Sequence, residues 1–279
     1  MLGSASAARP RAAIGRRAAM ATVAALFSLA VIAWLLTVRQ AMDMRSMVTG
    51  VADVGTLMPN NMSAPVFMTM WVTMMVAMMF PTIAPMVLAH RMVVAKRAGG
   101  SLASMAFVAG YLVLWTVAGI IPLGLFLAFN NLAPTSTLAS SLPRIAGATL
   151  LVAGLYQFTP FKAVCLRACR NPFDFITSHD FGAGPLNDFR AGLSHGAFCL
   201  GCCWTLMVVL VVVGLMNLAW MAILAVVFLA EKNWRHGVGL ARIAGTAVAV
   251  LGIVVIAEPG LLQVISTFQP AHVSMGGHM

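Results

Sequence analysis

The sequence predicts an all-α membrane protein, a polytopic helical bundle of about seven (six to seven) transmembrane helices with its N-terminus inside the cell. Hydrophobic residues make up 61% of the 279-residue chain and charged residues only 9%, whereas an ordinary soluble domain carries about 25% charged residues. Several apolar runs approach the roughly 20 residues that cross a bilayer. This composition excludes a water-soluble globular enzyme, a disordered protein and a disulfide-stapled secreted domain.

Seven apolar segments without strand-like alternation are the predicted spans, in chain order 20–38, 64–89, 103–129, 145–161, 192–213, 217–230 and 243–257. The first is expected to be an uncleaved anchor rather than a signal peptide, because Arg39 follows it without a small-residue cleavage site. The sixth is short, so a re-entrant segment or an extension of the fifth remains an alternative. The predicted organisation is a basic cytoplasmic arm (1–18), a transmembrane domain (19–258) and a flexible C-terminal tail (259–279).

The basic residues set the predicted orientation. With seven crossings, fourteen Lys and Arg residues fall in segments predicted to be inside, and three, Arg39, Arg45 and Arg144, fall outside. Because cytoplasmic loops carry an excess of Lys and Arg, this asymmetry predicts an N-terminus inside and a C-terminus outside. The net charge of +10 is therefore assigned to helix ends facing the lipid bilayer, and no nucleic-acid partner is expected.

Methionine is concentrated in the second segment and in the outer loop before it. Thirteen of the 21 methionines lie within residues 42–92. Four of them pair at i,i+4 spacing on a helix, namely Met74 with Met78 and Met75 with Met79. Thioethers are soft ligands that suit Cu(I) better than Zn(II), Mg(II) or Ca(II). The alternative is that methionine fills irregular gaps between helices.

A second set of candidate ligands lies in the fifth segment: His195, Cys199, Cys202 and Cys203. Their spacing of i, i+4, i+7 and i+8 places all four along one stripe of a helix. An imidazole and several thiolates form a soft set that can hold Cu(I) or Zn(II). The alternative is that each cysteine is a small buried hydrophobic residue.

A further thiol pair, Cys165 and Cys169, is predicted at the inner end of the fourth segment. It begins the inside loop 162–191, which is expected to be irregular because it is rich in glycine and proline. The neighbouring Arg167 and Arg170 would favour the thiolate form. A permanent disulfide is not expected in a reducing cytoplasm, and two incidental interfacial thiols remain the alternative.

The two sulfur sets are expected at a similar depth. At a rise of about 1.5 Å per residue, residues 199–203 lie ~10–16 Å from the inner end of the fifth segment, and Met78 and Met79 lie ~17–18 Å from that of the second. Glu231 and Lys232 end the sixth segment and are expected to anchor it at the membrane surface.

Three motifs, taken together, resemble one bacterial family. They are Met70-Trp71-x-x-Met74-Met75-x-Ala77-Met78-Met79-x-Pro81-x-x-x-Pro85-Met86, Cys165-Leu-x-x-Cys169-Arg-x-Pro172, and Gly196-x-x-Cys199-x-Gly201-Cys202-Cys203-Trp204-x-Leu206-Met207 followed by Gly214-x-Met216-Asn217. The family is that of predicted metal-binding integral membrane proteins, a domain of unknown function sometimes labelled copper chaperone. The resemblance covers roughly residues 20–257. It implies metal binding, an association with copper and a location in the bacterial inner membrane.

Three functions follow as hypotheses. The first is a protein without enzymatic activity that binds Cu(I) and passes it to or from a copper carrier or a recipient membrane enzyme. The second is a membrane thiol–disulfide oxidoreductase in which Cys165 and Cys169 exchange with Cys199 and Cys202. The third is a structural or assembly subunit whose sulfur atoms serve only in packing.

Overall fold

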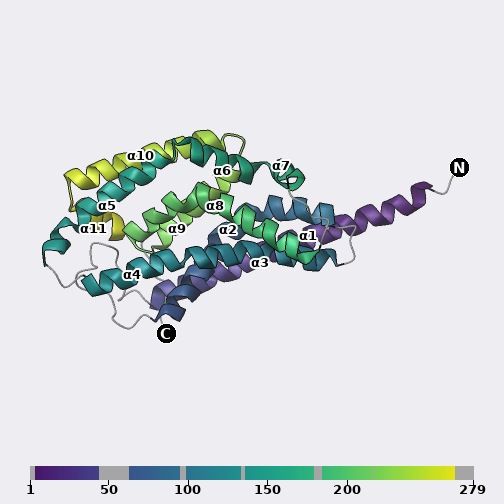
Figure 1. The fold of residues 1–279 in the computed structure, drawn as a ribbon, viewed down its shortest axis with the longest axis horizontal. Helices are drawn as coiled ribbons and strands as arrows, with labels where there is room; N and C mark the ends of the chain where they lie inside the picture. Colours follow the sequence, from purple (N-terminus) through teal and green to yellow (C-terminus); the bar gives the residue numbers. More distant parts are fainter. Residues whose placement is uncertain are drawn as a thin grey trace, which may run out of the picture.

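The described part of the chain consists of helices joined by short turns in the computed structural model (Figure 1), and no strand occurs in it. The structure describes residues 4–43, 63–94, 99–132, 136–178, 184–215 and 217–267. The outer-loop methionines Met44, Met47, Met58 and Met62 lie outside these ranges. The helices are α1 (Ser4–Asp43), α2 (Ala64–Val94), α3 (Gly100–Ala118), α4 (Ile120–Leu132), α5 (Ser136–Tyr156), α6 (Pro160–Arg170), α7 (Pro172–Thr177), α8 (Pro185–Val213), α9 (Leu218–Asn233), α10 (Gly237–Ala257) and α11 (Leu261–Thr267).

Five of these helical segments are long and apolar enough to cross a membrane, which makes this a membrane protein. They are Arg17–Met42, Ala64–Val94, Gly100–Leu125, Pro185–Val213 and Gly237–Ala257. A sixth crossing results if α5 and α6, bent by 62° at their junction, form one broken span. The predicted span 217–230 corresponds to α9, whose 16 residues fall just short of the roughly 17–25 that a span needs.

The helix α2 is the most buried of the five candidate membrane spans. Of its apolar stretch, 67% is buried, against 17% for the corresponding stretch of α1. Figure 1 shows α5 and α10 side by side along one edge, α8 and α9 next to them, and α1, α2 and α3 along the opposite edge. The most methionine-rich helix is therefore surrounded by protein, whereas α1 presents mostly lipid-exposed side chains.

Small residues allow the closest helix pairs to form. At the contact of α3 with α8, a Cβ atom added to Gly192 would overlap the carbonyl oxygen of Phe107. At the contact of α5 with α10, a Cβ atom on Gly154 would lie 2.5 Å from the backbone nitrogen of Ala249. Packing of backbones through small residues drives helix association in membranes, where lipid is as apolar as the side chains.

The predicted third span is interrupted at Gly119, where α3 gives way to α4. The indole of Trp71 occupies this position: a Cβ atom on Gly119 would lie 2.5 Å from its Cδ1 atom, and its Nε1 atom donates a hydrogen bond to the carbonyl oxygen of Trp115 at 2.9 Å. This contact fixes α2 against the end of α3.

The segment predicted as an irregular inside loop is largely helical, and that prediction is wrong for α6 and α7. The chain turns after Tyr156, and α6 begins at Pro160 with Thr159 as its N-cap, whose side chain accepts a hydrogen bond from the backbone nitrogen of Lys162. A proline in the first turn and a threonine cap are favourable helix starts. Because of the bend, α6 folds back against α8.

The predicted C-terminal tail contains α11. The side chain of Leu262 is fully buried, and the Nδ2 atom of Asn217 donates a hydrogen bond to the carbonyl oxygen of Ser266 at 2.9 Å. These contacts hold α11 against the start of α9. Residues 268–279 lie outside the described ranges.

Candidate metal centre

Three cysteines of α8 form the middle of the candidate site. Cys199, Cys202 and Cys203 are each 0% exposed, and all are free thiols. The Sγ atom of Cys202 lies 3.4 Å from that of Cys203 and donates a hydrogen bond to the carbonyl oxygen of Cys199 at 3.2 Å. The predicted helical stripe of thiols is therefore present and faces the protein interior.

The folded-back helix α6 adds a fourth thiol. The Sγ atom of Cys169 lies 3.9 Å from that of Cys202, although 33 residues separate the two cysteines in the chain. Cys169 is half-buried, so it is the most accessible thiol of the group. Arg170, predicted to favour the thiolate, instead donates hydrogen bonds to the carbonyl oxygens of Glu231 and Arg235.

Gly201 makes the approach of α6 possible. A Cβ atom at this position would lie 2.7 Å from the Sγ atom of Cys165, so only glycine lets the two helices come this close. The same contact shows where Cys165 lies: its side chain packs on the backbone of α8 at Gly201. The two loop cysteines of the prediction therefore have different surroundings, and Cys169 is the one that contacts Cys202.

The distance between Cys169 and Cys202 is typical of two sulfur ligands of one ion. With metal–sulfur bonds of about 2.3 Å, two ligand atoms lie ~3.8–4.0 Å apart at tetrahedral or trigonal angles. No group of three or more His, Cys, Asp or Glu side chains within the described ranges is arranged as a metal site. The geometry thus offers a pair of thiols with further sulfur nearby, rather than the closed four-ligand cage of a structural zinc site.

Two other helices bring polar and soft atoms to the thiols. The Nζ atom of Lys232, on α9, donates hydrogen bonds to the Sγ atom of Cys199 at 3.0 Å and to the Oγ1 atom of Thr82, on α2, at 3.2 Å. It also lies 3.8 Å from the Sδ atom of Met79. We refer to Met79, Cys169, Cys199, Cys202 and Cys203 as the sulfur cluster.

Tyr111, on α3, completes the surroundings of Cys199, because its hydroxyl oxygen lies 3.1 Å from the Sγ atom. Sequence analysis did not identify Tyr111, Thr82 or Lys232. Lys232 was expected to be a surface anchor, but its side chain is only 6% exposed. The signal available in the sequence was a Glu-Lys pair at the end of an otherwise apolar helix, since an ionisable residue within a membrane segment is by default a functional candidate.

The other methionines and the histidine of the prediction lie in the same core. The side chains of Met74, Met75 and Met78 are at most 2% exposed. The fourth predicted methionine, Met79, is the one that contacts Lys232. His195 lies one helical turn before Cys199. Its ring packs against three aromatic rings, with centroid distances of 6.0 Å to Phe107, 6.0 Å to Tyr111 and 5.2 Å to Phe175.

Two further buried contacts join ionisable side chains of different helices. The Nζ atom of Lys162, on α6, lies 2.8 Å from the Oε2 atom of Glu231, on α9. The Nε2 atom of His90, at the end of α2, lies 3.0 Å from the Oδ1 atom of Asp188, at the start of α8. The first contact joins α6 to α9, and the second joins α2 to α8.

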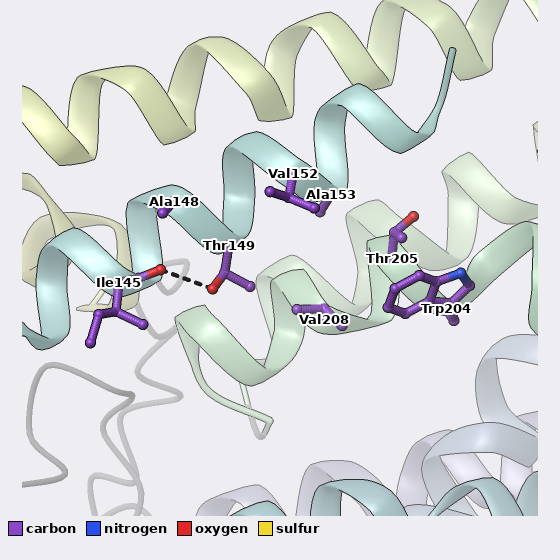
Figure 2. Close-up of a pocket in the computed structure, with 8 residues that line it drawn as sticks. All are labelled: Ile145, Ala148, Thr149, Val152, Ala153, Trp204, Thr205 and Val208. Carbon is purple, nitrogen blue, oxygen red and sulfur yellow. Dashed lines mark hydrogen bonds between the residues drawn. The ribbon is translucent and has the colours of Figure 1, made fainter. Parts of the chain in front are cut away.

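A separate apolar groove lies between α5 and α8 (Figure 2). Its volume is about 340 Å³, and the hydroxyl of Thr149 donates a hydrogen bond to the carbonyl oxygen of Ile145 within the same helix. The side chain of Thr205 accepts one from Gln157 at 2.8 Å. Since no sulfur, carboxylate or imidazole lines the groove, it offers no ligand to a metal ion. The lining residues are Ile145, Ala148, Thr149, Val152, Ala153, Trp204, Thr205 and Val208.

Comparison with known proteins identifies a family. No curated protein and no solved structure matches the chain. A family model named PpoB2 and described as a copper chaperone matches residues 68–255, which include all five members of the sulfur cluster and Lys232. By this match, which extends over more than half of the sequence, the chain belongs to the PpoB2 copper chaperone family.

Proposed function

We propose that this protein binds Cu(I) at the sulfur cluster and handles or delivers copper at the bacterial inner membrane, with its N-terminus inside. The observation that carries the proposal is the convergence of a thioether and four thiols from α2, α6 and α8, centred on the pair Cys169 and Cys202 at 3.9 Å. Thiolates and thioethers favour soft ions such as Cu(I) over hard cations, and the family match agrees with copper as the cargo.

Cu(I) fits this arrangement better than Zn(II). Structural zinc is almost always held by four protein ligands in a closed site, whereas no such group of His, Cys, Asp or Glu occurs among the described residues. Cu(I) tolerates a pair of thiolates, and the uncharged thioether of Met79 can support it. In the described ion pairs no carboxylate contacts the sulfur cluster, so hard cations lack the anionic oxygen ligands that they prefer.

The remaining predicted residues are proposed to serve transfer. Met74, Met75 and Met78 would form a thioether route along α2 to the thiolates, which bind more strongly. His195 would assist one helical turn away, and Cys165 with the half-buried Cys169 would exchange the ion with a cytoplasmic copper carrier. A recipient membrane enzyme is the alternative partner.

The proposal is tested by elemental analysis of the purified protein after loading with Cu(I) under reducing conditions. We expect copper near one ion per chain in the wild type and a loss of most of it in a Cys199→Ser, Cys202→Ser, Cys203→Ser variant. A Cys169→Ser variant should also lose copper, whereas Cys165→Ser should retain more. Unchanged copper content in the triple variant would remove the assignment and leave the sulfur atoms as packing groups.

The thiol–disulfide oxidoreductase remains a second candidate, because Cys169 and Cys202 are close enough to form a disulfide after a small movement. In that reaction their two thiols would pass two electrons and two protons to a disulfide of a substrate, which is reduced as the Cys169–Cys202 bond forms. Labelling of Cys169 with a membrane-impermeant thiol reagent in intact and permeabilised cells distinguishes the two functions. Labelling from the oxidising outer side would favour the oxidoreductase.

A further inference from the structure

Lys232 is a buried cation inside the sulfur cluster. Its Nζ atom contacts the Sγ atom of Cys199 at 3.0 Å, the Oγ1 atom of Thr82 at 3.2 Å and the Sδ atom of Met79 at 3.8 Å. These three groups come from two different helices, and the ammonium comes from a third. The ammonium is therefore surrounded by the same soft atoms that are proposed to hold the metal.

The carboxylates of the neighbourhood are engaged elsewhere. Glu231, the preceding residue, lies 2.8 Å from Lys162, and Asp188 lies 3.0 Å from His90. Within the described ranges no ion pair joins Lys232 to a carboxylate. Because an ammonium in a low-dielectric interior needs a negative partner, the thiolates of the cluster are the anions that can balance Lys232.

We propose that Lys232 is a specificity-determining residue that makes the sulfur cluster selective for monovalent soft cations. This inference rests on the proposed function. A pair of thiolates, one monovalent ion and the Lys232 ammonium together carry no net charge. The same pair with a divalent ion and Lys232 carries one positive charge in a site closed off from water, which is costly.

The preference does not depend on how many of the four thiols of the cluster ionise. Whatever that number is, the Lys232 ammonium repels a divalent ion about twice as strongly as a monovalent ion at the same position. Lys232 is also held in place, because the adjacent Glu231 is bound to Lys162 and its carbonyl oxygen to Arg170. The ammonium therefore stays beside the cluster and acts as a fixed positive charge.

The test uses Ag(I) and Cd(II), two soft closed-shell ions that differ chiefly in charge. Competition binding to the purified full-length protein gives the ratio of their affinities. We expect the wild type to prefer Ag(I), and Lys232→Gln to lower the Ag(I)-to-Cd(II) affinity ratio on the order of 100-fold, because a nearby unit charge is removed. Lys232→Arg, which restores the charge, should recover most of the wild-type ratio.

The control is Arg91→Gln, which removes a positive charge near the end of α2, where the Arg91 side chain donates a hydrogen bond to Ser101 and not to the cluster. Its affinity ratio should equal that of the wild type. If Lys232→Gln leaves the ratio unchanged while copper still binds, or if the control shifts the ratio equally, the role of Lys232 is overturned and the copper site stands. If the wild type binds neither Cu(I) nor Ag(I), the proposed function fails as well.

Discussion

Two lysines of this protein are buried in neighbouring places but have different partners. Lys162 is 1% exposed and pairs with the carboxylate of Glu231, whereas Lys232 is 6% exposed and contacts sulfur and a hydroxyl. The residues at positions 231 and 232 thus face different groups at the end of one helix. In the first pair the lysine ammonium is balanced by the carboxylate of Glu231, and the pair joins α6 to α9. The second lysine is balanced only if the thiols around it carry charge, and this difference underlies the binding site proposed above.

The largest effect is expected from breaking the complete pair. Glu231→Gln leaves the ammonium of Lys162 buried without its carboxylate, which should lower the free energy of unfolding by about 3–5 kcal/mol. Unfolding of the purified protein in detergent, followed by circular dichroism, measures this loss. Adding Lys162→Gln should recover most of the stability, because the pair is then removed as a whole. A double variant as unstable as the single one would show that the pair is not an independent clamp.

A smaller effect is expected from separating α6 and α8 at the cluster. Gly201→Ala brings a Cβ atom to 2.7 Å from the Sγ atom of Cys165, and overpacking of this kind costs about 1–3 kcal/mol. Because the displaced helix also carries Cys169, copper affinity should fall together with stability. Gly239→Ala is the control, since its Cβ atom would meet nothing within 4 Å. Equal copper affinity in the two variants would contradict the role given to the α6–α8 contact.

The smallest effect is expected from replacing one sulfur atom near Lys232, the thioether of Met79. Met79→Leu nearly conserves volume and should change stability by less than about 1.5 kcal/mol, but the loss of one thioether should weaken Cu(I) binding about tenfold, or ~1.4 kcal/mol. Met86→Leu is the matched control, because Met86 lies on the same helix and is also buried. Competition with a Cu(I) chelator measures both. Indistinguishable affinities would remove Met79 from the site.

Part of the site follows from helical periodicity. The spacing of Cys199, Cys202 and Cys203 predicted one buried stripe, and these side chains lie together in the core. The i,i+4 methionines of α2 predicted shared faces, and all four are buried because α2 is surrounded by other helices. These features were predictable because the positions of neighbouring side chains on one helix depend only on its fixed rise and turn.

An all-helical membrane protein rich in soft ligands could be predicted from the residues alone, because hydrophobicity and helical spacing are local properties of the chain. Which of these ligands lie in contact depends on how the helices pack. The contact of Cys169 with Cys202 requires the bend after Tyr156, and the position of Lys232 requires α9 to pack against α2 and α6. Contacts between helices far apart in the chain depend on the packing of whole surfaces, and no local pattern specifies them.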